Sequence, residues 1–148
     1  TVRSIEKLRI IGCYNWGEYK QLNAGTVVGN YQAMNRVITG AWYYDPNGLD
    51  IRAEYGHIKS DDANVDEDGF YALAAYRFGK FIPVVRYDMY RDKANKTSAN
   101  NKDNYLIGCT YELIKDVKFQ LNYIISDYTD KVDKGTGNSL QIMCLLKF

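Results

Sequence analysis

The chain has 148 residues, enough for one domain, and its 19 basic and 18 acidic side chains nearly cancel. That balance provides no bulk positive field, so the composition argues against nucleic acid as a partner. Tyrosine is unusually abundant, with 14 copies beside 5 Phe and 2 Trp. Tyrosine suits strands and membrane interfaces, where its ring is buried and its hydroxyl stays hydrated.

Eight segments alternate apolar and polar residues with a period of two, which predicts strands and not helices. In chain order these segments are Leu8–Trp16, Arg36–Tyr44, Leu49–Lys59, Phe70–Phe78, Ile82–Arg91, Asn104–Glu112, Val117–Asp127 and Ser139–Phe148. Each has about the 9–11 residues that a tilted strand needs to cross a bilayer. Ala24–Asn30 is the candidate for an extra strand, and eight is the count that we favour.

Short and long connections alternate between these segments. The predicted tight turns are Asp45–Gly48, Phe78–Phe81 and Leu113–Asp116. The predicted long polar loops are Ser60–Gly69, Asp92–Asp103 and Thr129–Asn138. This alternation places all short turns, and the C-terminus, at one end of the sheet. Outer-membrane β-barrels show the same asymmetry.

One parity of each predicted strand carries no charged residue. In the last strand this set is Leu140, Ile142, Cys144, Leu146 and Phe148. In the second strand we assign Ile38, Gly40, Trp42 and Tyr44 to it. An Arg or Lys at the middle of a bilayer costs about 2–4 kcal/mol, so an uncharged face across eight strands predicts contact with lipid.

Aromatic side chains gather near both ends of the uncharged face. Those toward the short turns are Trp42, Tyr44, Tyr76, Phe78, Phe81, Tyr111, Phe119 and Phe148, and those toward the long loops are Tyr87 and Tyr105. They predict two aromatic girdles at the membrane interfaces. The alternative is a soluble barrel or sandwich whose apolar face points inward. Loop sorting and rim aromatics favour an all-β, antiparallel transmembrane β-barrel.

Three segments resemble the phosphate-selective porin O and P family. They are Leu49–Tyr55, Gly69–Phe78 and Ile82–Asp88, and the last, with the Asn104-Tyr105 strand opening, is similar to the C-terminal part of those barrels. The terminal Phe148 resembles the signal that the barrel-assembly machinery reads. The resemblance covers roughly residues 36–148.

This resemblance implies the cell outer membrane, contact with lipid and lipopolysaccharide, and a homotrimer. Barrels of this family are larger than eight strands. The chain is therefore expected to be a single domain, residues 1–148, that is either the C-terminal half of a larger porin barrel or a small barrel closed on itself.

The charged parity supplies the candidate functional residues. Four cations are candidates for an anion path, namely Arg52, Arg77, Arg86 and Lys118. Three carboxylates share their face, namely Glu54, Asp88 and Glu112. A channel that selects anions needs cations facing a wet lumen. The competing interpretation is that all seven pair across neighbouring strands and hold the wall together.

Other chemistry is weakly indicated. The acidic segment Asp61–Gly69 departs from an EF-hand calcium loop and is expected to be a solvated loop, and His57 is expected to stand alone. Cys13, Cys109 and Cys144 are far apart, which predicts small buried side chains and neither disulfides nor a metal site. Motifs of nucleophilic catalysis and phosphate binding are missing from the sequence, so neither an enzyme nor a cofactor is expected.

Two functions remain. The first is an outer-membrane porin for passive diffusion of small solutes, with a preference for anions such as phosphate as the finer expectation. The second is a small, non-transporting outer-membrane barrel with a plugged interior, acting as a structural or surface-interaction protein. Eight strands enclose only enough room for side chains, so the number of strands in the barrel decides between them.

Overall fold

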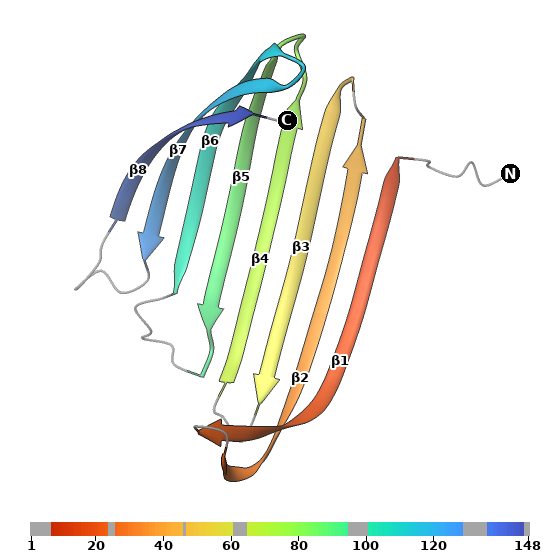
Figure 1. The fold of residues 1–148 in the computed structure, drawn as a ribbon, viewed down its shortest axis with the longest axis vertical. Helices are drawn as coiled ribbons and strands as arrows, with labels where there is room; N and C mark the ends of the chain where they lie inside the picture. The colour runs from red at the N-terminus through yellow and green to blue at the C-terminus, as the bar shows by residue number, and fades with distance from the viewer. Residues whose placement is uncertain are drawn as a thin grey trace, which may run out of the picture.

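Eight antiparallel strands in chain order form a single sheet (Figure 1). The structure is a computed structural model that describes residues 7–23, 26–45, 47–60, 65–94, 101–128 and 136–146. The strands are β1 (Leu8–Asn23), β2 (Thr26–Tyr44), β3 (Leu49–Ser60), β4 (Val65–Tyr76), β5 (Phe81–Asp92), β6 (Lys102–Ile114), β7 (Val117–Tyr128) and β8 (Thr136–Leu146). Within those residues, no helix is long and apolar enough to cross a membrane. The predicted all-β class and strand count are confirmed.

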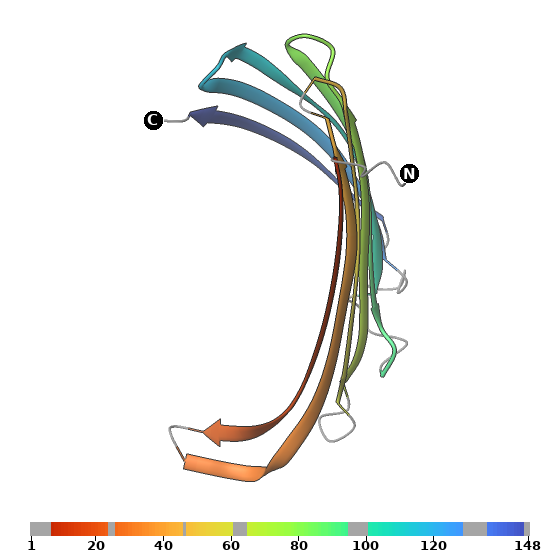
Figure 2. The ribbon, with the colours of Figure 1, turned by 90° about the vertical axis from the view of Figure 1, so that its right-hand side faces the viewer.

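The first two strands are longer than the sequence pattern predicted. Ala24–Asn30 is not an extra strand, because β2 already begins at Thr26. β1 and β2 pair along most of their length, with a register shift between Lys20 and Leu22. Their far ends curl toward one side of the sheet (Figure 2).

The short connections meet at one end of the sheet, as predicted. The connections from β2 to β3, from β4 to β5 (residues 77–80) and from β6 to β7 (residues 115–116) lie there, and the last described residue of β8 lies at the same end (Figure 1). In the turn between β4 and β5, Phe78 and Phe81 exchange backbone hydrogen bonds of 2.8 and 3.0 Å. Gly79 has a φ of 59°, a conformation that glycine adopts without a steric penalty.

The sheet is open. Within the described residues, β1 pairs with β2 alone and β8 with β7 alone, and the two outer strands do not contact each other. The alternative of a small barrel closed on itself is therefore not the arrangement that the structure has. The eight strands form a curved wall (Figure 2).

Cross-strand register sorts the side chains into two faces, because directly opposed residues of an antiparallel pair share a face. One uncharged row crosses all eight strands: Leu8, Tyr43, Ile51, Ala74, Val85, Ile107, Tyr123 and Leu140. The neighbouring row on the other face is Arg9, Trp42, Arg52, Leu73, Arg86, Leu106, Ile124 and Ser139. Charge is thus confined to one face through the middle of the sheet.

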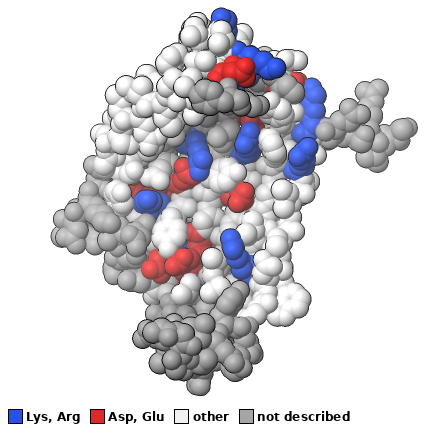
Figure 3. Space-filling view, viewed as in Figure 1, with Lys and Arg blue, Asp and Glu red and all other residues white. Residues whose placement is uncertain are grey.

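The charged face is the concave one. Figure 2 shows the direction of curvature, and Figure 3, which views the concave side, shows basic and acidic side chains gathered over its centre. The convex face carries the apolar side chains, and none of the described hydrophobic residues is buried by the chain itself. Ile10, Ile107 and Ile142 are 76%, 62% and 75% exposed. A soluble barrel would place these faces the other way round.

The assignment of faces within β2 was wrong by one residue. Ala41 lies opposite Ala53, and Trp42 lies opposite Arg52, so Trp42 belongs to the concave face. Val37, Thr39, Ala41 and Tyr43 form the convex set of this strand. From Val37 onward both parities of β2 are uncharged, so its sequence carries no charge that marks the face.

Val84 and Val85 offer a matched test of the two faces, because they are adjacent valines on opposite sides of β5. Val85→Arg places a guanidinium in the uncharged convex row, and we expect it to lower the free energy of unfolding in lipid vesicles by about 2–4 kcal/mol. Val84→Arg places the same group on the concave face and should cost about 1 kcal/mol or less. Urea titration followed by tryptophan fluorescence measures both, and equal or reversed costs would contradict the assignment.

Candidate functional site

The concave face holds its charges in small ionic clusters. In the first, Arg52 of β3 pairs with Asp50 two residues earlier, with its Nη2 2.7 Å and its Nε 2.9 Å from the carboxylate oxygens. The indole Nε1–H of Trp42 donates to the same carboxylate at 3.1 Å. The guanidinium of Arg52 lies 4.4 Å from the centre of the Trp42 ring. The cation is therefore fixed by a carboxylate and an aromatic face together.

The second cluster repeats this arrangement on β5. The Nε of Arg86 donates to both oxygens of Asp88, at 2.8 and 3.0 Å. Its guanidinium lies 4.7 Å from the centre of the Tyr71 ring on the neighbouring strand. Asp88 and Tyr71 are directly opposed in the register, so the three side chains form one compact group.

The third cluster lies near the short turns and joins three segments. Glu112 of β6 accepts from both Arg77, in the turn after β4, and Lys118, directly opposite on β7. The Glu112 side chain is 19% exposed, so water screens these ion pairs only in part. One carboxylate thus ties together two adjacent turns.

The four cations predicted to line an anion path are all paired. Among the predicted carboxylate partners, Asp88 and Glu112 take part, whereas Glu54 has no ion pair with any described residue. The partner that the sequence analysis missed is Asp50. Two of the pairs lie within one strand at a spacing of two residues, not across strands as expected. That spacing, an acid and an arginine on one face, is the signal that could have identified them.

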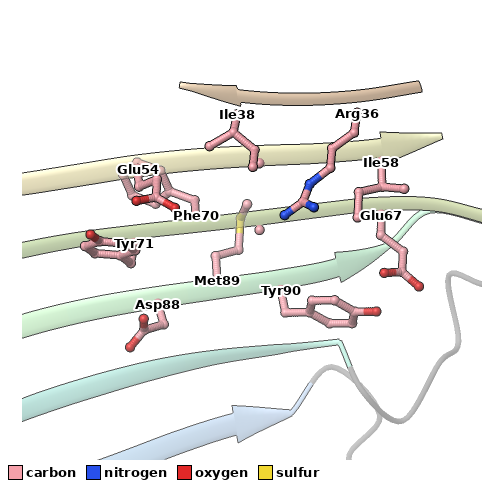
Figure 4. A pocket seen from close by; sticks show the side chains of 12 residues that line it. Arg36, Ile38, Glu54, Ile58, Glu67, Phe70, Tyr71, Asp88, Met89 and Tyr90 are labelled. Carbon is pink, nitrogen blue, oxygen red and sulfur yellow. The ribbon is translucent and has the colours of Figure 1, made fainter. Parts of the chain in front are cut away.

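A hollow opens on the concave face beside these clusters. Its volume is about 360 Å³, and its polar lining is Arg36, Glu54, Glu67, Tyr71, Asp88 and Tyr90 (Figure 4). Gly56 and Gly69 lie directly opposite each other in the register and also line it. The position was not predicted from the sequence, although two opposed glycines on one face are a readable sign of missing side-chain volume.

A different charged cluster lies on the convex side, at the long-loop ends of β3 to β5. His57 Nδ1 is 2.7 Å from the carboxylate of Asp68, which also accepts from Tyr55 at 2.9 Å. Lys93 pairs with the same carboxylate at 2.5 Å, and this hydrogen bond raises the pKa of Lys93. His57 therefore does not stand alone. The acidic segment is not a loop throughout, because β4 begins at Val65.

Most of the predicted girdle residues lie on the convex face. Ring pairs form between Tyr76 and Phe78 (4.5 Å), Phe81 and Tyr111 (4.9 Å), and Tyr87 and Tyr105 (5.3 Å). Phe119 is 45% exposed on the same face. Trp42 and Tyr44 instead share the concave parity of β2. Phe148 lies outside the described residues, and the girdle role itself stays a prediction.

Glu112→Gln tests whether the clusters stabilise the wall. Loss of this carboxylate leaves Arg77 and Lys118 facing each other without an anion, and we expect the free energy of unfolding to fall by about 1–2 kcal/mol after allowance for screening by water. Glu54→Gln is the matched control and should change it by about 0.5 kcal/mol or less. Similar values from urea titration of both variants would show that the Glu112 cluster does not stabilise the fold.

Comparisons with known proteins agree with the two-faced sheet described above. The model of the Gram-negative porin family matches residues 11–143. An uncharacterized protein of Aquifex aeolicus (strain VF5) is 30% identical over 104 residues, which are 66% of this chain and 25% of that protein. The chain thus spans about a quarter of the length of the curated relative that it matches. The resemblance to the phosphate-selective porin O and P family in particular stays a prediction. With the match running from β1 into β8, the chain belongs to the Gram-negative porin family.

Proposed function

We propose that this sheet is a wall segment of an outer-membrane channel through which small solutes diffuse passively. One observation carries the proposal: the concave face is charged and the convex face is uncharged through its middle in every strand. A lipid-facing surface must avoid charge, whereas a water-filled lumen accepts it. Membership of the Gram-negative porin family supports the same location and activity.

The open edges bear on the number of strands. Within hydrocarbon, each backbone N–H and C=O needs a partner, so the outer edges of β1 and β8 require further antiparallel strands beside them. We infer that the channel wall contains more than eight strands. Such a barrel has room for water, whereas the alternative of a plugged, non-transporting barrel relies on eight strands closing tightly.

Selectivity is the finer part of the proposal. Unpaired cations would favour anions, but Arg52, Arg77, Arg86 and Lys118 each have a carboxylate partner. We therefore propose weak discrimination between small cations and anions, and we do not assign a phosphate preference to these four residues.

Partners follow from the same proposal. The convex face would contact outer-membrane lipid, with lipopolysaccharide at the long-loop rim. Assembly would use the barrel-assembly machinery, and a homotrimer is the oligomer implied by the family resemblance.

Planar-bilayer recording of the folded protein tests this function. We expect discrete conductance steps, with a reversal potential in a tenfold KCl gradient far below the roughly 59 mV of an ideally selective pore. Folded protein that inserts without conducting would sink the channel proposal. A reversal potential near that limit, with the sign of an anion-selective pore, would contradict weak selectivity. It would support the anion path predicted from the sequence.

A further inference from the structure

The hollow on the concave face is bounded by two polar rows. Toward the long loops, Arg36, Ile58 and Glu67 are successive cross-strand neighbours. Toward the short turns, Glu54, Tyr71 and Asp88 are successive cross-strand neighbours. Between them runs the row that contains Gly56 and Gly69. Successive rows of one face lie about 7 Å apart along an antiparallel strand, so the two polar rows, one on each side of the glycine row, are about 14 Å apart at the backbone.

The two glycines give the hollow its floor. A Cβ added at Gly69 would meet no atom within 4 Å, and one added at Gly56 would meet only the carbonyl oxygen of Val37, at 3.9 Å. The space above both residues is therefore open to a ligand. Ile38 and Ile58 supply apolar surface beside this floor. A volume of about 360 Å³ lies in the range of small-molecule sites.

Two of the three carboxylates that line the hollow already have partners. Asp88 is bound by Arg86. Glu67 interacts with the hydroxyl group of Tyr90. Neither is therefore free to compensate a charged solute fully.

Arg36 and Glu54 differ from these groups. Neither has an ion pair or a side-chain hydrogen bond with any residue that the structure describes. They come from different rows, with opposite charges on opposite sides of the glycine floor. Figure 4 shows the guanidinium of Arg36 extending over the hollow and the Glu54 carboxylate beyond it. The cavity thus presents one uncompensated cation and one uncompensated anion.

We propose that this hollow binds a small zwitterionic solute with an apolar body, of the amino-acid class. The solute carboxylate would accept hydrogen bonds from Arg36, its ammonium group would donate to Glu54, and its body would lie over Gly56 and Gly69. A simple anion or cation would satisfy one protein charge and leave the other uncompensated. Weak binding of this kind concentrates a solute at the wall and still releases it. As a station along a solute path, the site rests on the proposed channel function.

Three ligands with the same isobutyl body separate the charges: L-leucine (zwitterion), L-leucinamide (cation) and 4-methylpentanoate (anion). Their dissociation constants for the folded protein in detergent micelles come from saturation-transfer NMR titrations, which detect millimolar binding. We expect leucine to bind about tenfold more tightly than either analogue, since each analogue loses one charge-assisted contact. Leucine binding that is no tighter than that of either analogue, or no binding of leucine, would overturn the proposal.

Substitutions assign the two contacts. Arg36→Gln should weaken leucine about tenfold and leave leucinamide unchanged, whereas Glu54→Gln should weaken leucine about tenfold and leave 4-methylpentanoate unchanged. Gly69→Leu fills the floor and should weaken all three ligands. Arg9→Gln is the matched control, because it removes a concave-face cation outside the hollow. Equal losses from Arg9→Gln and Arg36→Gln would show a general charge effect and contradict the site.

The binding assay tests the site and the bilayer recordings test the channel, so either proposal can be rejected without the other. Leucine preference in a protein that does not conduct would retain the site and reject the channel. Conductance without leucine preference would retain the channel and reject the site.

Discussion

The antiparallel ladder is the constraint on which the rest of this structure depends. It aligns directly opposed residues, so the uncharged positions of eight strands become one continuous convex surface. A slip of one residue in β3 or β5 would turn Arg52 or Arg86 toward the lipid. Each such arginine at mid-depth would cost about 2–4 kcal/mol, so the two faces and the register specify each other.

The same alternation explains the chemistry of the concave face. Arg52 and Arg86 each form an ion pair with an aspartate two residues away on the same strand. Each guanidinium also lies against an aromatic ring of a neighbouring strand. These contacts orient the side chains along the wall and neutralise them locally. Where two glycines interrupt the lining, the neighbouring Arg36 and Glu54 have no ion pair with any residue that the structure describes. Ion pairing therefore neutralises Arg52, Arg77, Arg86 and Lys118 locally, whereas separated charges remain beside the two glycines.

Much of this arrangement could be predicted from the sequence. The period of two and the turn residues gave the strands and the sorting of connections, and the charges gave the faces of seven strands. The face of β2 could not be predicted, because Trp42 and Ala41 are equally uncharged and only pairing with β3 separates them. The Asp68 cluster was hidden because a polar segment of a strand looks like a loop. The hollow depends on which glycines are opposed, which is a property of register.

The native cysteines provide the most direct test of which face meets water. Cys13 belongs to the concave face, whereas Cys109 and Cys144 belong to the convex face. The sequence predicted buried cysteines, but Cys13 and Cys144 are exposed. The measurement is labelling of the protein in lipid vesicles with a charged, water-soluble thiol reagent, followed by peptide mass spectrometry. If the concave face lines a wet lumen, Cys13 is modified, while Cys109 and Cys144 react only after unfolding. Rapid modification of Cys109 and Cys144 with protection of Cys13 would contradict this orientation.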